Sequence, residues 1–245
     1  SLRIRPLSAT VIRAVAESGA QTVSVAPEAG SERLRQLINK CVTEDDIIRA
    51  IDTISDVGLR QIKLYFMIGL PTETDDDIEE IIRLTLDAKS RIEKTGCRIA
   101  LTVEPFVPKA GTPFQWLAMA GSGDLERRTR RIKSGLAGSG IEVRAESVGW
   151  SLVQGVLSRG DVRLGAALAS MPENSLAAWR QALAQHDLSA EHYIHRELPL
   201  GEPLPWSVVD SGVATSYFRD ELDKAWRGGQ TAACPPQDCS KCGVC

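Results

Sequence analysis

The chain has 245 residues and a formal net charge of −3, with 43% hydrophobic and 25% charged residues. These values are typical of a folded protein with one large core or two modest ones, and they exclude a disordered tail. The charge provides no general attraction to nucleic acid. No apolar run approaches the roughly 20 residues that cross a bilayer and no signal-peptide pattern opens the chain, so a cytoplasmic location is predicted.

The first half of the chain alternates predicted strands and helices. Strands are predicted at 2–5, 22–26, 62–68 and 98–103, and helices at 9–17, 31–39, 44–57 and 78–94. Strands that are linked by helical crossovers form parallel, right-handed β-α-β units. A closed eight-fold barrel needs more repeats. We therefore predict an α/β fold, a partial TIM-like (β/α) barrel.

The segment 61–77 is the most informative part of this pattern. Its apolar run 62–68 predicts a parallel strand that is covered on both faces. Gly69 and Pro71 then end the strand, and Thr72 and Thr74 are candidate caps for an acidic helix start. By itself this is an ordinary strand-to-helix turn, but α/β enzymes place their ligands at such strand ends.

The second half of the chain lacks this regular alternation of predicted strands and helices. A basic helix is predicted at 125–133, a strand at 141–146, helical structure at 151–185 and a helix at 213–226. Trp150 and Trp179 are predicted to anchor the core of this part. We place a domain boundary near Gly121, which gives a partial barrel at 1–120 and a mainly helical extension at 121–245.

Six cysteines divide into two groups. Cys41 and Cys97 stand alone and are predicted to be buried thiols, whereas the last twelve residues hold Cys234, Cys239, Cys242 and Cys245. Cysteines with two residues between them, as in CxxC, allow neighbouring thiolates to converge on one ion. The tail therefore predicts a metal site, and both zinc and a [4Fe-4S] cluster accept four cysteine ligands.

Three ordered motifs carry a family resemblance. They are the E-x-G-S turn at 28–31 after one strand, the G-x-P-T-E turn at 69–73 after the next, and the GTP turn at 111–113 after the third. In this order they resemble the radical SAM superfamily, especially the branch associated with cobalamin-binding domains, with methylthiotransferases and with Elongator-type enzymes. The likeness is good over roughly the first half of the chain. It is looser beyond, where it includes the LPW and final CGVC segments.

The resemblance implies the later strands of a (β/α)6 barrel that binds S-adenosylmethionine and a [4Fe-4S] cluster. The intact parent would form a 5′-deoxyadenosyl radical and abstract hydrogen from an unknown substrate. The CxxxCxxC segment that holds the cluster in this superfamily is missing, so we expect a fragment that is inactive alone. Cobalamin use stays open, and the redox setting favours an auxiliary iron-sulfur cluster over zinc in the tail.

The resemblance also implies cofactor contacts at the strand ends. Glu28, in the same polar turn as Ser31, would face the cofactor ribose, or it would only cap the helix that starts at Ser31. Lys40 would meet the methionine carboxylate, or it would be a solvated lysine. The backbone at Gly69 and Pro71 would approach the adenine.

Other candidate contacts have two interpretations each. Phe106 and Val107 would flank the adenine or fill the barrel mouth. Tyr65 alternates with the apolar positions, as Lys63 does, and faces either the barrel interior or solvent. No catalytic residue is identified.

Partners are less well defined by the sequence. The cations in 127–133 would contact RNA phosphates or form a solvated helix face. A sheet without its leading strands has an open edge, which predicts homodimer pairing. The alternative to an enzyme is a metal-stabilised docking module, with a zinc-bearing RNA-modification subunit as a third hypothesis.

Overall fold

The computed structural model describes residues 2–235, 239 and 241–244. The chain forms two compact units. The first consists of Ser1–Pro105 and Gly123–Glu146, and the second of Phe106–Ser122 and Ser147–Cys245. The first unit therefore includes a helix and a strand from beyond the boundary predicted near Gly121. They belong there because they add one more β-α-β repeat to the sheet.

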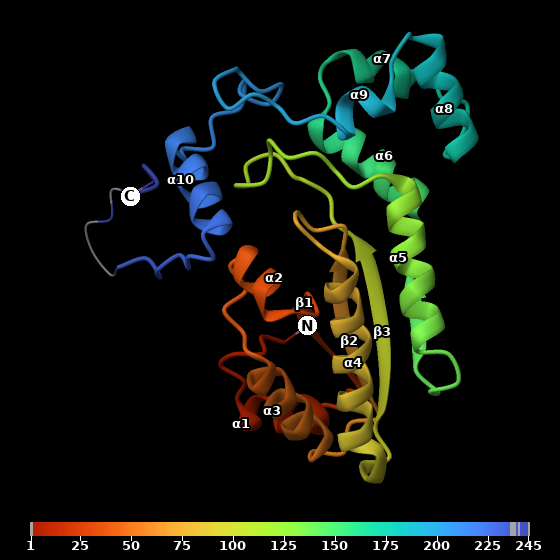
Figure 1. The fold of residues 1–245 in the computed structure, drawn as a ribbon, viewed down its shortest axis with the longest axis vertical. Helices are drawn as coiled ribbons and strands as arrows, with labels where there is room; N and C mark the ends of the chain where they lie inside the picture. The colour runs from red at the N-terminus through yellow and green to blue at the C-terminus, as the bar shows by residue number, and fades with distance from the viewer. Residues whose placement is uncertain (1, 236–238, 240, 245) are drawn as a thin grey trace. The chain divides into compact units, whose positions relative to one another are not determined.

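The first unit is a run of β-α repeats (Figure 1). Its elements are α1 (Ala9–Glu17), β1 (Thr22–Glu28), α2 (Glu32–Leu37), α3 (Glu44–Ser55), β2 (Gln61–Ile68), α4 (Asp75–Ile92), the short 3₁₀ helix η1 (Glu93–Thr95), β3 (Arg98–Pro105), α5 (Ser122–Gly135) and β4 (Glu142–Ala145). Helix α1 has the bounds that the sequence predicts. The other predicted elements of this unit form within a few residues of their expected ends, except that Leu2 makes only a single bridge, to Val25.

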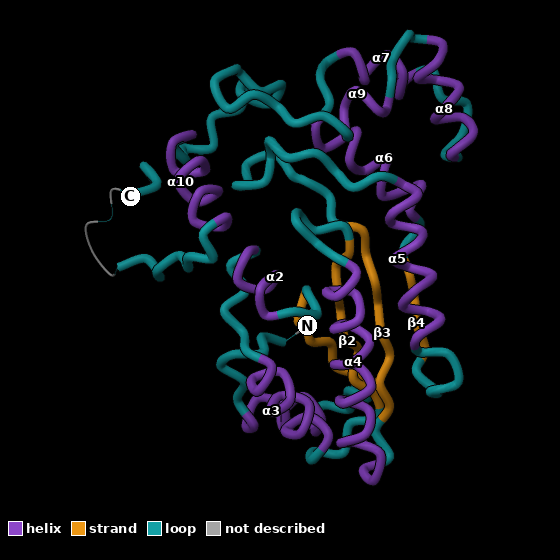
Figure 2. Tube along the Cα trace, in the orientation of Figure 1, coloured by secondary structure: helices purple, strands orange, loops and turns teal. Residues whose placement is uncertain are grey.

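The four strands form one parallel sheet in the order β1-β2-β3-β4, and Figure 2 shows β2, β3 and β4 side by side. Val25 pairs with Leu64, which in turn pairs with Leu101, so the strands run in register through the middle of the sheet. Helices α1, α3 and α4 pack side by side, and α3 and α4 contact the strands. The predicted α/β class, a partial barrel with a helical extension, is confirmed.

The two faces of this sheet differ in burial. Along β2, Ile62, Leu64, Phe66 and Ile68 are buried, whereas Gln61, Lys63, Tyr65 and Met67 on the other face are half-buried. The sequence predicts cover on both faces of this strand, and the structure shows that one face of β2 is more deeply covered than the other. The strand order β1-β2-β3-β4 advances in one direction. Right-handed crossovers in such an order all lie on the same side of the sheet, so the helices of this unit cover one face.

Helices α3 and α4 begin at N-cap residues that the sequence predicts. Thr43 and Asp46 form a reciprocal capping box at α3, as Thr74 and Asp77 do at α4. Of the two candidate caps at α4, Thr74 is the one used. Glu44, Asp45, Asp75 and Asp76 place negative charge in the first turns, where the helix dipole is favourable to it.

The second unit is mainly helical, with α6 (Val148–Arg159), α7 (Arg163–Ala169), α8 (Leu176–Gln185), α9 (Ala190–Ile194) and α10 (Thr215–Trp226). One of its apolar clusters consists of Trp116, Leu117, Leu198, Leu204 and Leu222. Trp179 is buried as predicted, but Trp150 is 39% exposed, so its predicted anchoring role is wrong. No helix in the described part of the chain is long and apolar enough to span a membrane.

Candidate functional site

Two strand ends lie next to each other at the carboxyl edge of the sheet. Because β1 and β2 are parallel and paired, the turns that follow Glu28 and Ile68 emerge at the same edge. Both turns use left-handed backbone, with φ of 70° at Glu28, 81° at Gly69 and 62° at Thr72. Positive φ in a non-glycine residue costs free energy and often marks a functional turn. This edge is the candidate site.

Glu28 and Lys40 form an ion pair at this edge. Lys40 Nζ lies 3.1 Å from Glu28 Oε1, and the two side chains are 32% and 28% exposed. Glu28 therefore pairs with a cation rather than capping the next helix. Partial exposure leaves both charged groups accessible to a ligand, and a ligand with its own charges would exchange one set of pairings for another.

Ser31 has a structural role in α2. Its hydroxyl accepts a hydrogen bond from Leu34 N and donates one to Asp77 Oδ1 at 2.5 Å. The other oxygen of Asp77 accepts from Arg33 at 2.5 Å and from Thr74 N at 2.8 Å. These bonds tie the turn after β1 to the start of α4. The hydroxyl proton of Ser31 is thus used within the protein.

Arg35 stabilises the same turn through hydrogen bonds to its backbone. It is 1% exposed, and its guanidinium donates to the carbonyls of Ala29, Gly30 and Val42 at 3.1, 2.6 and 2.9 Å. Burial lowers the pKa of Arg35, and the neighbouring Glu32 carboxylate opposes that shift. Sequence analysis did not single out Arg35, because an arginine in a short polar helix gives no sign of burial. Its three carbonyl acceptors fix the backbone on both sides of α2.

Glu73 and Arg128 fix the turn after β2. Glu73, whose side chain is 1% exposed, accepts from Gly69 N at 2.6 Å. Arg128 of α5 lies 2.9 Å from the Glu73 carboxylate and also donates to the Glu73 main-chain oxygen at 2.9 Å. The Gly69 amide is therefore engaged by the protein. Pro71 lies between these two anchored positions and is half-buried.

Burial raises the pKa of Glu73 to about 7, although the Gly69 amide and Arg128 act in the opposite direction. Between about pH 4.5 and about pH 7, the unfolded chain has lost the Glu73 proton while the folded chain keeps it. The contribution of Glu73 to the free energy of unfolding is therefore fully present below this interval and falls as pH rises through it.

Glu73→Gln is expected to remove this pH dependence, because an amide oxygen still accepts from Gly69 N and does not ionise. Across the interval, the free energy of unfolding of E73Q minus that of the unsubstituted chain should rise by about 1.4 kcal/mol per pH unit. Urea denaturation at a series of pH values measures this slope. Glu79→Gln is the control, since the exposed Glu79 pairs with Arg131 and its pKa is lowered, so no slope is expected in this range. Equal slopes for both variants would contradict the prediction.

The helix-free face of the sheet carries polar side chains in rows. Tyr65 is aligned with Thr102 and Arg144 across three strands, and Lys63 is aligned with Ser24 and Ala100. Lys63 and Tyr65 are half-buried on this face. In a (β/α) barrel this face is the interior, so the first of their two interpretations fits the fold.

Phe106 and Val107 belong to the second unit. Val107 is 7% exposed, and the Phe106 ring packs edge-to-face on Phe114 at 5.8 Å. These contacts are those of residues that fill an apolar core. Their predicted contact with adenine stays a prediction.

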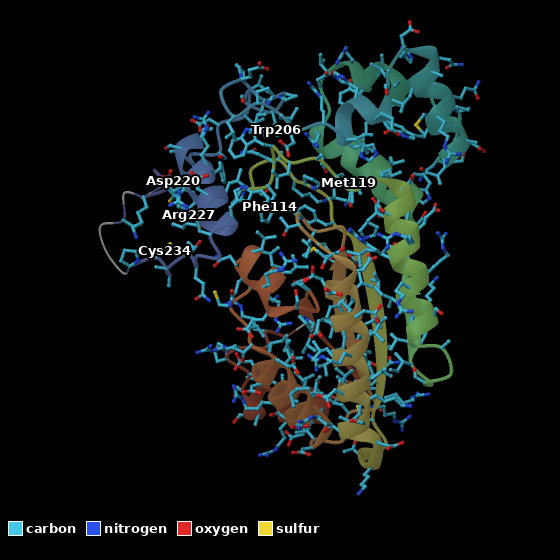
Figure 3. The ribbon with its side chains drawn as sticks, viewed as in Figure 1. Phe114, Met119, Trp206, Asp220, Arg227 and Cys234 are labelled. Carbon is cyan, nitrogen blue, oxygen red and sulfur yellow. The ribbon has the colours of Figure 1, made fainter. Side chains whose placement is uncertain are left out.

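The cysteine tail follows α10, and Figure 3 shows Cys234 on this segment. Cys234 is exposed, Cys239 is buried and Cys242 is half-buried, while Cys245 lies outside the described residues. Within 2–235, 239 and 241–244, no three histidine, cysteine or acidic side chains are placed to hold a metal ion. The described residues thus show no assembled metal site, and the tail site stays a prediction. Cys97 is buried as expected, but Cys41 is exposed, contrary to its prediction.

The basic helix α5 is largely neutralised within its own unit. Arg127, Arg128 and Arg131 pair with Asp75, Glu73 and Glu79 of the α4 region, and Arg130 pairs with Glu126 of its own helix. Such pairing leaves little free positive charge for phosphate groups. Contact with RNA phosphates and a solvated helix face both stay predictions for this helix.

Comparison with known proteins gives a family match over part of the chain. Residues 2–85 match the model of the Radical SAM superfamily. An uncharacterized protein of Methanocaldococcus jannaschii is 42% identical over 144 residues, which make up 59% of this chain and 31% of that protein. A protein of Pyrococcus horikoshii named an uncharacterized methyltransferase is 32% identical over 83 residues, 34% of this chain and 18% of that protein. The matched regions thus span under a third of these relatives.

One similar solved structure is a sugar phosphate isomerase/epimerase from Parabacteroides distasonis. It has 9% identity and a TM-score of 0.34, with 91% of this chain and 76% of that chain covered. The family match confirms the resemblance to the radical SAM superfamily over residues 2–85.

Proposed function

We propose that residues 2–85 provide part of the S-adenosylmethionine-binding wall of a radical SAM enzyme. The observation that supports this most directly is the half-exposed Glu28–Lys40 pair, located where two parallel strands end and inside the segment that matches the family. A cation and a carboxylate at one edge suit a cofactor that carries a carboxylate and a ribose diol.

The residues of this edge would bind and orient the cofactor. Lys40 would pair with the methionine carboxylate, and Glu28 would accept hydrogen bonds from the ribose hydroxyls. The left-handed turn at Gly69, held by Glu73 and Arg128, would offer its backbone to the adenine. The bound cofactor would supply the reactive group, and the polar face with Lys63 and Tyr65 would meet the substrate.

Methyl transfer is one reaction class within this proposal, because one relative is named a methyltransferase. The alternative of a docking module gains no support from α5, since four of its cations are paired with carboxylates. We therefore favour the enzyme. In the intact enzyme we propose a [4Fe-4S] cluster beside S-adenosylmethionine and an auxiliary metal or cluster at the cysteine tail.

Binding of S-adenosylhomocysteine, measured by isothermal titration calorimetry, tests the proposal. We expect the chain to bind it, and we expect Lys40→Met and Glu28→Gln each to weaken binding by about tenfold, because each loses a charge-assisted contact. Adenosine has no carboxylate. Its binding should therefore be weakened by Glu28→Gln but not by Lys40→Met.

Asp52→Asn is the matched control, because it removes the Asp52–Arg91 ion pair of the same unit away from this edge. It should bind S-adenosylhomocysteine as the unsubstituted chain does. Absence of binding, or equal binding by all variants, would contradict the proposed cofactor contacts.

A further inference from the structure

The turn after β2 has a threonine where glycine is the usual residue. Glu73 N donates to Leu70 O at 3.1 Å. Between them lie Pro71 and Thr72, and φ at Thr72 is 62°. A proline followed by a residue of positive φ is the pattern of a type II turn, whose third residue is usually glycine or asparagine. A β-branched residue adopts this conformation at a steric cost and keeps it only where its surroundings enforce it.

Arg33 of α2 restrains Thr72 from the neighbouring strand end. Its guanidinium donates to Thr72 Oγ1 at 2.8 Å and to the Thr72 main-chain oxygen at 3.0 Å. The planar guanidinium holds its donors in a fixed fork, so the two bonds together fix the position and orientation of Thr72. Because β2 fixes the start of the turn, a Thr72 that is held in this way keeps its left-handed φ.

Asp77, in the first turn of α4, holds Arg33 in this position. It is 4% exposed, and its Oδ2 accepts from Arg33 Nη2 at 2.5 Å. The same carboxylate accepts from the Ser31 hydroxyl at 2.5 Å and from Thr74 N at 2.8 Å. One buried carboxylate is thus bonded to the start of α2 and to the end of the turn after β2. The two strand-end turns therefore form one hydrogen-bonded unit.

The Arg33 restraint acts on the turn and not on the fold as a whole. The Arg33 side chain is 52% exposed, and ion pairs that involve exposed side chains contribute little to stability. Ser31 and Thr74 donate to the Asp77 carboxylate independently of Arg33. Removal of the guanidinium is therefore expected to leave the strands and α4 in place and to release Thr72.

We propose that Arg33 is a positioning residue for the S-adenosylmethionine site and that it holds the Gly69–Pro71 backbone against the adenine by keeping Thr72 left-handed. The inference rests on the proposed function and adds to it a side chain that touches no part of the cofactor. Thr72 directly follows this backbone, so a change in its φ turns the Pro71 carbonyl, because the peptide group moves as a plane. Since α2 follows the turn at Glu28, the same contact keeps the ribose and adenine contacts at a fixed separation.

Adenosine binding, measured by isothermal titration calorimetry, tests the proposal. Arg33→Met should weaken adenosine binding by about tenfold, because Thr72 then leaves the left-handed region in most unbound molecules. Thr72→Gly should rescue this loss, because glycine adopts positive φ without a steric cost. In the Thr72→Gly background, Arg33→Met should therefore change adenosine binding by less than about threefold. A purely structural role of Arg33 predicts the same loss in both backgrounds.

Arg91→Met is the matched control. Arg91 is 47% exposed and pairs with Asp52 and Asp87 in the last turn of α4, at the other end of that helix from Asp77. It should bind adenosine as the unsubstituted chain does. Weakening by Arg91→Met to the same extent as by Arg33→Met would overturn the proposal, because loss of any exposed ion pair of this unit would then have the same effect.

A measurement without ligand separates this inference from the proposed function. Amide hydrogen exchange at Glu73 N, which closes the turn, should become about tenfold faster in Arg33→Met and stay unchanged in Arg91→Met. Unchanged exchange in Arg33→Met would overturn the restraint on Thr72. Adenosine binding that Arg33→Met leaves unchanged would overturn the positioning role alone, whereas no adenosine binding by the unsubstituted chain would overturn the proposed cofactor site and this role with it.

Discussion

Arg159→Met is expected to lower the free energy of unfolding of the second unit by about 3 kcal/mol, because it leaves the carbonyls of Leu117 and Arg196 without a donor. The Ile194 carbonyl would lose one of its two donors and keep Met119 N. Arg159 is 2% exposed in α6. Its guanidinium donates to the carbonyls of Leu117, Ile194 and Arg196 at 2.7, 3.1 and 2.7 Å. Burial, with a smaller contribution from Arg196, lowers the pKa of Arg159 to about 10. One side chain thus joins three separate segments of this unit.

Tryptophan fluorescence measures this effect selectively. The five tryptophans are Trp116, Trp150, Trp179, Trp206 and Trp226, and all belong to the second unit. Urea denaturation followed by this signal should show a lower midpoint for Arg159→Met. Arg180→Met, at an exposed position of α8, is the control and should change the free energy by less than about 0.5 kcal/mol. Similar midpoints for the two variants would show that the carbonyls find other donors.

Gly30→Ala is expected to destabilise the first unit by about 3 kcal/mol, at the upper end of the usual cost of overpacking. A Cβ at this position would lie 2.8 Å from the main-chain oxygen of Asp77 and closer still to Ile81 N. Both neighbours are backbone atoms of α4, so no side chain can rotate away. The turn after β1 would have to move, and the Ser31–Asp77 hydrogen bond and the Glu28–Lys40 pair would be disturbed with it.

The labelling rate of the buried Cys97 thiol measures how readily the first unit opens. Cys97 is 8% exposed immediately before β3, and burial raises the pKa of its thiol, so it reacts slowly in the folded state. We expect Gly30→Ala to speed thiol labelling of Cys97, as measured by mass spectrometry. Gly123→Ala is the control, because a Cβ there meets nothing within 4 Å and alanine suits a helix. Equally slow labelling in both variants would contradict the prediction.

Local elements of the first unit could be predicted because their signals are contiguous in the sequence. The spacing of apolar residues gave α1 its bounds, and the Thr43 and Thr74 caps marked the starts of α3 and α4. The burial of β2 was harder to predict from the sequence. Its apolar run is continuous, but Lys63, Tyr65 and Met67 lie on the face that no helix of this unit covers.

The candidate site was only partly predictable. Glu28 and Lys40 were identified as site residues, but nothing in the sequence indicated that they pair with each other. The roles of Arg35 and Arg128 were missed, because each is recognisable only by its burial and by partners on other elements. Arginines in polar helices are usually solvated, so composition favours the wrong interpretation.

The sequence by itself determined the β-α order, the helix caps and the motifs at 28–31 and 69–73, because each depends on residues that are neighbours along the chain. The tertiary structure alone decided which side chains meet. Glu73 is joined to Arg128, and Arg159 to Leu117 and Arg196, across long stretches of chain. Local patterns specify how a segment folds, but contacts between distant segments depend on packing the whole unit.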